Sequence, residues 1–268
     1  EALGGGSGGS YKMGDGLPRE PEKYTMAGHR GNVTKVAMHP MYSFVASASE
    51  DATIRLWDCE EGEHERTLKG HSGIVKFLAF HQNGQLLASC ATDMAIKLWN
   101  LATFAVQKTL TGHQHEVSGL AFVPSHPDFL LSCSRDQSIR LWDTLSGTCL
   151  HTLAQGHTDW VKRVAVSGSG ALFATASNDE SILVWSTEQV LQSKSQGAVL
   201  ATLDEHEHQI DAIAWAPLEA ARTIEHSEYA GNTTPKHPPL DHNHTSTQSP
   251  PADPDKHDDE DDESHDKA

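Results

Sequence analysis

The chain has 268 residues, 37% of them apolar, and carries a formal net charge of -17 at pH 7. Nine acidic residues and one lysine between Asp253 and Asp266 supply much of that charge, so the remainder of the chain is only moderately acidic. Proteins that bind duplex nucleic acid usually present a basic face to phosphate. The charge distribution therefore argues against a nucleic-acid partner.

The cysteines and the hydropathy pattern exclude further classes. Cys59, Cys90, Cys133 and Cys149 form no CxxC pair, which favours reduced, mostly buried thiols over a disulfide frame or a zinc site. No apolar stretch approaches the roughly 18 residues that would cross a bilayer, and the N-terminus lacks the features of a signal peptide. We expect a cytoplasmic protein with no membrane span, no cofactor and no metal.

In chain order, a flexible linker is predicted first. Residues 1–20 contain GGGSGGS and few apolar side chains, which is typical of a flexible segment. Residues 21–217 carry a repeating pattern and form the predicted folded domain. Residues 218–268 are rich in His, Pro, Ser, Thr and Asp and could not bury enough apolar surface to offset the entropy of ordering. They are predicted to form a disordered, acidic tail.

The repeat in the central region predicts the fold. Four times a Gly-His pair is followed by an Asp that precedes a Trp by six residues, and the histidines are 42, 42 and 44 residues apart (from 29 to 71, 71 to 113 and 113 to 157). A period of about 40 to 45 residues is typical of a four-stranded propeller blade. The predicted fold is therefore all-β, a β-propeller. Its blades are expected at about 28–69, 70–111, 112–155 and 156–204, with the start of a fifth at 205–217.

Each repeat has the internal pattern of four strands. In the first, an alternating run at Val33, Val36 and Met38 precedes an apolar run at 44–47, a tight turn at Glu50-Asp51 and a strand at 54–57. Alternation with a period of two, broken by turn residues, indicates strands. The last segment of each repeat is more polar, which suits the outer edge of a blade.

The recurring polar residues predict a buried structural network. The His can donate and accept, the Asp accepts, a hydroxyl four residues before the Asp bridges them, and the Trp indole N–H closes the chain. A catalytic triad is the alternative, but a catalytic set occurs once and needs an exposed nucleophile. We therefore assign no catalytic residue. The predicted network comprises His29, Ser47, Asp51 and Trp57; His71, Ser89, Asp93 and Trp99; His113, Ser132, Asp136 and Trp142; and His157, Thr175, Asp179 and Trp185.

Several segments carry a resemblance to known proteins. SASEDATIRLWD, SCATDMAIKLWN and SCSRDQSIRLWD resemble WD repeats. PREPEKYTMAGHR, ERTLKGH, GHTDWVKRV and EHEHQIDAIAWAP are similar, more narrowly, to the lissencephaly-type nuclear-distribution proteins, which regulate cytoplasmic dynein. The resemblance covers roughly residues 18–217.

The resemblance implies both a fold and partners. Members of that family have a seven-bladed propeller after a dimerising helical motif and a coiled coil. No coiled-coil heptads precede residue 18, so the dimerising segment is expected to be absent here, and the repeats account for about four and a half of the seven blades. The implied partners are the cytoplasmic dynein motor domain and proteins of the nuclear-distribution pathway. The implied location is the cytoplasm at microtubules, centrosome or spindle pole. A role as regulatory subunit beside acetylhydrolase catalytic subunits, or as a WD-repeat scaffold of another pathway, is the alternative.

Two groups of residues are predicted to contact a partner. Loops before the first strand and between the second and third share one face of a blade, which places Arg30, Arg135 and Trp160 there. Trp160 is interpreted either as an exposed interface residue or as a ring packed against the neighbouring blade. Arg55, Lys97 and Arg140 each stand two residues before a Trp, and form either a basic partner surface or ordinary solvated positions; Leu183 breaks this series.

An open set of blades would leave strand edges unpaired, because a propeller closes by pairing its first and last blades. We therefore expect the chain to be part of a longer protein, and to aggregate or unfold partially when purified alone.

Overall fold

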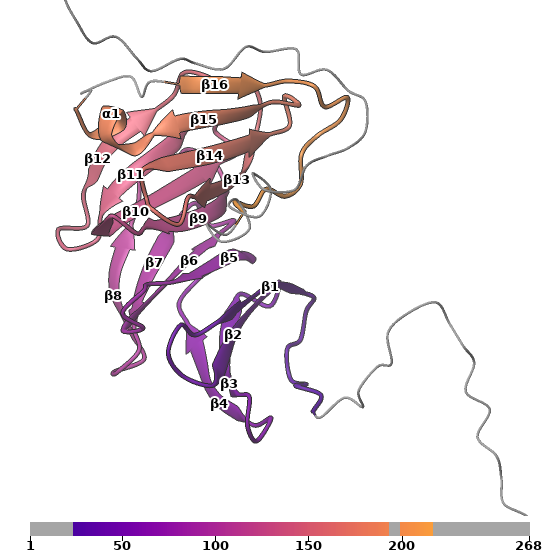
Figure 1. Ribbon diagram of the computed structural model, residues 1–268. Coiled ribbons are helices and arrows are strands. Elements are labelled where there is room, and N and C mark those ends of the chain that lie inside the picture. Colours follow the sequence, from indigo (N-terminus) through magenta and orange to yellow (C-terminus); the bar gives the residue numbers. More distant parts are fainter. Residues whose placement is uncertain (1–23, 193–198, 217–268) are drawn as a thin grey trace, which may run out of the picture. The chain divides into compact units, whose positions relative to one another are not determined.

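The computed structural model describes residues 24–192 and 199–216. The predicted linker and tail lie outside these residues. The described strands form four antiparallel sheets of four strands each, so the predicted all-β fold is confirmed (Figure 1). The first sheet contains β1 (Val33–Met38), β2 (Phe44–Ser49), β3 (Thr53–Asp58) and β4 (His64–Lys69). The second contains β5 (Val75–Phe80), β6 (Leu86–Ala91), β7 (Ile96–Asn100) and β8 (Ala105–Leu110).

The other two sheets repeat this order. The third contains β9 (Val117–Val123), β10 (His126–Ser134), β11 (Ile139–Asp143) and β12 (Cys149–Leu153). The fourth contains β13 (Val161–Val166), β14 (Leu172–Ser177), β15 (Ile182–Ser186) and β16 (Val199–Leu203). In every sheet the strands pair in chain order, so each sheet is a meander. We refer to the four sheets as blades 1 to 4.

Burial varies across each blade as its sequence pattern predicts. The second strands β2, β6 and β14 bury all but their first residue, and β10 buries its last five. In contrast, β4 exposes four of its six residues and β16 exposes all five. Figure 1 shows the first strands of successive blades running side by side, and β1 contacts β5, β5 contacts β9 and β9 contacts β13. The polar fourth strand is therefore the outer edge of each blade.

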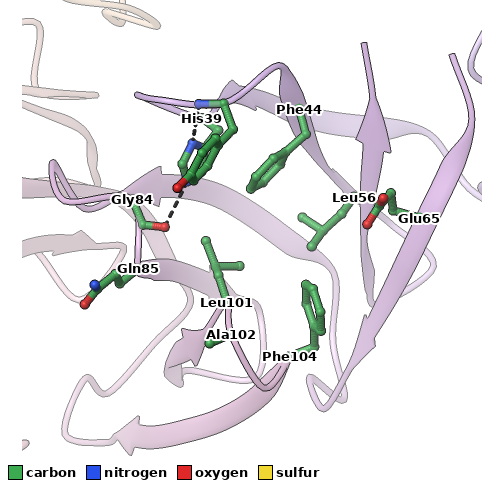
Figure 2. Close-up of a pocket in the computed structure, with 10 residues that line it drawn as sticks. His39, Phe44, Leu56, Glu65, Gly84, Gln85, Leu101, Ala102 and Phe104 are labelled. Atoms are coloured by element: carbon green, nitrogen blue, oxygen red, sulfur yellow. Dashed lines mark hydrogen bonds between the residues drawn. The ribbon is translucent and has the colours of Figure 1, made fainter. Parts of the chain in front are cut away.

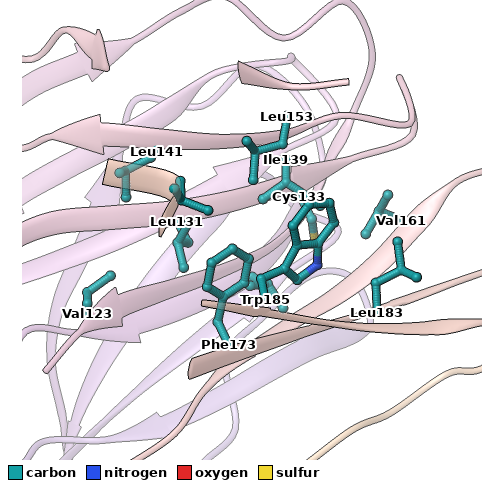
Figure 3. Packing of buried hydrophobic residues seen from close by; sticks show 12 residues of the cluster. Val123, Leu131, Cys133, Ile139, Leu141, Leu153, Val161, Phe173, Leu183 and Trp185 are labelled. Carbon is teal, nitrogen blue, oxygen red and sulfur yellow. The ribbon is translucent and has the colours of Figure 1, made fainter. Parts of the chain in front are cut away.

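The apolar core lies between adjacent blades. Three clusters of buried side chains join blade 1 to blade 2, blade 2 to blade 3, and blade 3 to blade 4. Figure 3 shows the last of these, where Phe173 and Trp185 of blade 4 stack at 5.8 Å and pack with Leu131 and Ile139 of blade 3. Burial of this apolar surface is the main favourable term that holds one blade to the next.

A hydrogen bond supplements the core at each junction. His39 Nε2 donates to the carbonyl of Gly84 at 2.8 Å, and His81 Nε2 donates to that of Pro127 at 2.9 Å. At the third junction the Ser125 hydroxyl donates to the carbonyl of Gly170 at 3.2 Å. Each bond joins the turn after a first strand to the next blade, at the corresponding turn for Gly84 and Gly170 and at the start of β10 for Pro127.

In the tight turn of each repeat, the residue directly after the Asp has a left-handed backbone conformation. The residues are Ala52, Met94, Gln137 and Glu180, with φ between 62° and 68°. In the first repeat the turn lies at Glu50-Asp51, as the sequence predicted, and the left-handed Ala52 follows it directly. A left-handed L-residue costs roughly 1 to 2 kcal/mol, so the hydrogen bonds around the Asp must offset that cost.

The predicted start of a fifth blade has a different form. Residues 204–216 contain no strand, although they pack on blade 4: Ile210 is 7% exposed and the Trp215 indole N–H donates to the carbonyl of Ala165 at 3.0 Å. A short helix α1 (Thr187–Gln192), which the repeat pattern did not predict, follows β15 and buries Val190 in the core between blades 3 and 4. In blade 1, Val33 and Val36 are each 52% exposed, whereas the equivalent Val75 and Leu78 of blade 2 are 0% and 2% exposed.

A matched pair of leucine substitutions in blade 3 tests this core. Leu130→Ala removes a fully buried side chain and should lower the free energy of unfolding by about 2 to 5 kcal/mol. Leu145→Ala, at a position that is 67% exposed, should change it by less than about 0.5 kcal/mol. Urea denaturation followed by tryptophan fluorescence measures both. Equal losses would contradict the placement of the core.

Candidate functional site

The four residues of the predicted network lie within hydrogen-bond distance in every blade. The His Nδ1 lies 2.8 to 2.9 Å from the Asp Oδ2, and the His Nε2 lies 2.7 to 2.8 Å from the Ser or Thr hydroxyl. The Trp Nε1 lies 2.7 to 2.9 Å from that same hydroxyl. The structure therefore brings all the network residues together, blade by blade.

Only one assignment of protons satisfies every partner. The Asp carboxylate only accepts, so the His must carry its proton on Nδ1. The Trp indole N–H only donates, so the hydroxyl accepts from Trp and donates its own proton to His Nε2. The resulting chain runs Trp to hydroxyl to His to Asp. The His, rather than the hydroxyl, therefore connects to the Asp, which differs from the order that the sequence analysis expected.

Burial of the hydroxyl decides against a catalytic interpretation of this chain. Ser89, Ser132 and Thr175 are each 0% exposed, and the Trp indole occupies an acceptor position on each oxygen. A nucleophile must reach its substrate. These hydroxyls cannot do so in the folded chain.

Burial and hydrogen bonding set the charge states in the network. Burial lowers the pKa of His71, His113 and His157, and the adjacent carboxylates only partly oppose that shift. Burial alone would raise the pKa of Asp179, but hydrogen bonds from Ser181, the Thr158 amide and His157 outweigh it and lower the pKa to about 2. A neutral His beside an ionised Asp is therefore the stable state.

Sequence reasoning missed a second hydroxyl in the network. Thr53, Ser138 and Ser181 stand two residues after the Asp, and each hydroxyl donates to the Asp Oδ1 at 2.6 to 2.7 Å. Ala95 occupies this position in blade 2, where only the backbone amide donates. The sequence contained a signal for this second hydroxyl, because three of the four repeats have Ser or Thr two residues after the Asp.

Each residue of the predicted basic series is half-buried and contacts a side chain of its own blade. The guanidinium of Arg55 lies 5.8 Å from the ring centroid of Trp57, and that of Arg140 lies 5.9 Å from the ring of Trp142. Lys97 Nζ donates to the Thr109 hydroxyl of its own blade at 3.2 Å. All three residues are half-buried, and the bond of Lys97 is exposed to solvent. A role of this series in binding a partner stays a prediction.

Glycine before the His makes room for these side chains. A Cβ added to Gly28 would come within 2.4 Å of an Arg55 nitrogen, and one added to Gly112 would come within 2.6 Å of an Arg140 nitrogen. Both glycines have a positive φ, at 156° and 155°, at the edge of the region that L-residues avoid. The Gly-His pair thus accommodates the basic residue and positions the His.

Trp160 lies in the loop directly before β13, the first strand of blade 4. The corresponding loops of the other blades lie at the same end of the strands. The ring of Trp160 is half-buried, with the guanidinium of Arg135 from blade 3 at 5.3 Å and the ammonium of Lys162 at 5.7 Å from its centroid. Its indole Nε1 is buried and has no hydrogen-bond partner among the described residues. The ring is therefore partly accessible, with a cation of blade 3 and one of blade 4 beside it, and its role at an interface stays a prediction.

Charged residues surround this tryptophan. Arg135, whose side chain is 52% exposed, pairs with Glu116 at 3.4 Å, and Lys162 pairs with Asp211 at 2.6 Å. We call Arg135, Trp160 and Lys162 the Trp160 cluster. Arg30, also predicted to contact a partner, is exposed on blade 1 and donates its backbone N–H to Asp51 rather than joining this cluster.

The described residues hold no group of three or more His, Cys, Asp or Glu side chains arranged to bind a metal ion. Within those residues, no helix has both the length and the hydropathy to span a membrane. All four cysteines are free thiols; Cys90 and Cys133 are buried, and burial raises the pKa of Cys133 to about 12.

The family model described as WD domain, G-beta repeat matches the chain four times, at residues 21–58, 62–100, 104–143 and 147–186. Together these matches cover more than half of the chain. The chain belongs to the WD40 repeat family. WD40 repeats are protein-interaction scaffolds and are generally not enzymes.

The WD40 repeat and the blade are offset by one strand. The match at 62–100 begins with β4, the outer strand of blade 1, and ends with β7, the third strand of blade 2. The matches at 104–143 and 147–186 are offset in the same way. Each of these three repeats therefore contributes to two blades, which couples neighbouring blades along the chain.

Asp136→Ala tests the structural role of the WD40 network. Removing the carboxylate leaves the His113 Nδ1–H and the Gln114 amide without their acceptor, at about 1 to 3 kcal/mol for each buried donor. Thermal unfolding by circular dichroism should show a clear drop in Tm. Asp128→Ala, an exposed carboxylate of the same blade, is the control. A variant at Asp136 that melts with the wild type would contradict the assignment.

Acidification should destabilise the fold in two stages. The unfolded chain takes up protons on His near pH 6.5, above the lowered pKa of His71, His113 and His157, so stability falls as the pH drops below about 6.5. Unfolded Asp protonates near 3.9, above the pKa of about 2 for Asp179, so a second loss follows between about pH 4 and 2. Urea midpoints measured from pH 8 to 3 check both stages. A midpoint independent of pH between 7.5 and 5 would refute the first.

Proposed function

We propose that this WD40 chain is a non-enzymatic regulator that binds the motor domain of cytoplasmic dynein at microtubules. In that role it would support nuclear migration, spindle positioning and dynein-driven transport. The proposal rests on the resemblance of residues 18–217 to nuclear-distribution proteins, together with the chemistry of the Trp160 cluster. Its location would be the cytoplasm, at microtubules and at the centrosome or spindle pole.

The Trp160 cluster has the properties of an interface hot spot. A partly covered tryptophan flanked by two cations offers an apolar surface and positive charge at one place, and Trp and Arg are enriched among residues that dominate binding energy. Arg135 is exposed enough to exchange Glu116 for a carboxylate of a partner.

The basic series contributes to this proposal only indirectly. Leu183 replaces the basic residue in blade 4, where it is 4% exposed and packs in the core. Arg55 and Arg140 lie at the same phase against tryptophan rings. Because this position is interior, the loss of a cation there leaves the surface of the Trp160 cluster unchanged.

A pull-down with purified dynein motor domain tests the proposal. Trp160→Ala should weaken binding at least tenfold, about 1.4 kcal/mol or more, because it removes the central ring of the cluster. Leu145→Ala, exposed in the β11–β12 loop at the other end of the strands, is the matched control and should bind as the wild type does. Circular dichroism confirms that both variants are folded. Failure of the wild-type chain to retain the motor domain, or equal binding by Trp160→Ala, would contradict the proposal.

A further inference from the structure

The junction of blades 1 and 2 contains an apolar cavity at the end of the strands opposite to the Trp160 cluster. The cavity has a volume of about 230 Å³ and lies beside the turn after β1, the β3–β4 side of blade 1 and the β7–β8 loop (Figure 2). Figure 2 shows Leu56, Leu101 and Phe104 around one space, with Glu65 beside Leu56. We call this space the blade 1–2 pocket.

Aromatic rings form one wall of this pocket. His39 stacks with Tyr42 at 5.0 Å and packs against Phe44 at 4.2 Å, and its Nε2–H bond to the Gly84 carbonyl fixes the ring across the junction. Tyr42 and the adjacent Met41 are 66% and 65% exposed. An apolar rim that continues into an apolar cavity is a feature of interaction sites rather than of an ordinary surface.

Phe104 occupies a backbone position that glycine takes in the neighbouring blades. Its φ is 55°, while the equivalent turns of blades 1 and 3 have Gly62 at 75° and Gly147 at 83°. An aromatic residue in the left-handed region is strained, and such strain is often associated with function. Here it places the ring in the pocket, where the guanidinium of Arg66 lies 5.1 Å from its centroid.

The equivalent junction of blades 2 and 3 differs in chemistry. Its cavity, of about 200 Å³, is lined in part by His81, Asn83, Asp128 and Thr144 and contains no Phe or Tyr. The apolar, aromatic lining therefore distinguishes the junction of blades 1 and 2 from that of blades 2 and 3, and does not follow from the repeat itself.

The charge beside the pocket is mainly acidic, although the guanidinium of Arg66 also lies beside Phe104. Glu65 lines it, and Glu60, Glu61 and Glu63 are exposed on the hairpin that leads into β4. Among the described residues Glu65 forms no ion pair. Pockets for small molecules usually measure about 300 to 1,000 Å³, so this volume suits one large apolar side chain rather than a whole cofactor.

We propose that the blade 1–2 pocket binds a peptide segment of a partner protein that inserts an aliphatic or aromatic side chain flanked by lysine or arginine. The inserted side chain contacts Leu56, Leu101 and Phe104. The flanking cation pairs with Glu65 and is attracted by the glutamates of the hairpin. This site is independent of the Trp160 cluster, so a partner bound here could be carried together with one bound at the other end of the blades.

NMR titration of the whole chain with three short peptides tests the proposal. The probes are acetylated, amidated Gly-Lys-Leu-Lys-Gly, Gly-Glu-Leu-Glu-Gly and Gly-Lys-Ala-Lys-Gly. The first should shift the backbone amides of Gln85 and Ala102 and bind at least tenfold more tightly than the other two. No binding of the first probe at millimolar concentration, equal binding of all three, or shifts confined to other residues would overturn the proposal.

Three variants identify the groups responsible. Phe104→Gly introduces the residue that the neighbouring blades have at this turn, so the fold should persist while binding of the lysine-flanked leucine probe falls at least tenfold. Glu65→Lys, at an exposed position, should reverse the preference in favour of the glutamate-flanked probe. Glu188→Lys makes the same change of charge on α1 and should bind like the wild type. An unchanged preference in Glu65→Lys, or full binding by Phe104→Gly, would overturn the proposal.

Discussion

The structure depends on a buried chain of hydrogen bonds that must be complete in every blade. A Trp donates to a hydroxyl, the hydroxyl donates to a neutral His, and the His donates to an ionised Asp. Each group is removed from water, so each must find its partner inside the protein. The Asp also accepts from the backbone amide after the His and from the turn that follows it, which ties together the first, second and third strands. The left-handed turn and the Gly before the His both follow from this requirement.

That constraint frees other positions for function. The core between blades needs only apolar volume, and the network uses one phase of the repeat, so loops at the strand ends can vary. Trp160 at one end and Phe104 at the other are such departures. The first gathers two cations around a tryptophan, and the second places an aromatic ring in an acidic, apolar pocket. The end with Trp160 thus favours acidic groups of a partner, and the end with Phe104 favours basic groups.

The regular part of the fold could be predicted because it is encoded locally. The spacing of His, Asp and Trp indicated the blades, and alternation of apolar residues indicated the strands. The hydroxyl donors at Thr53, Ser138 and Ser181 were visible at one phase but were overlooked. The helix after β15 and the strandless segment at 204–216 were not predicted, because they break the repeat and depend on contacts with blade 4.

The sequence by itself determined the repeat, its four-stranded unit and the polar network, since all of these follow from residue types at fixed spacing. Only the tertiary structure decided which side chains are free to bind. Arg55 and Arg140 look like surface cations in the sequence, yet they lie half-buried against the tryptophans of their own blades. Trp160 looks exposed, yet Arg135 of the preceding blade lies beside its ring. The exposure of a side chain depends on packing between blades. It cannot be predicted from the spacing within a single repeat, because that packing involves residues that are distant in the chain.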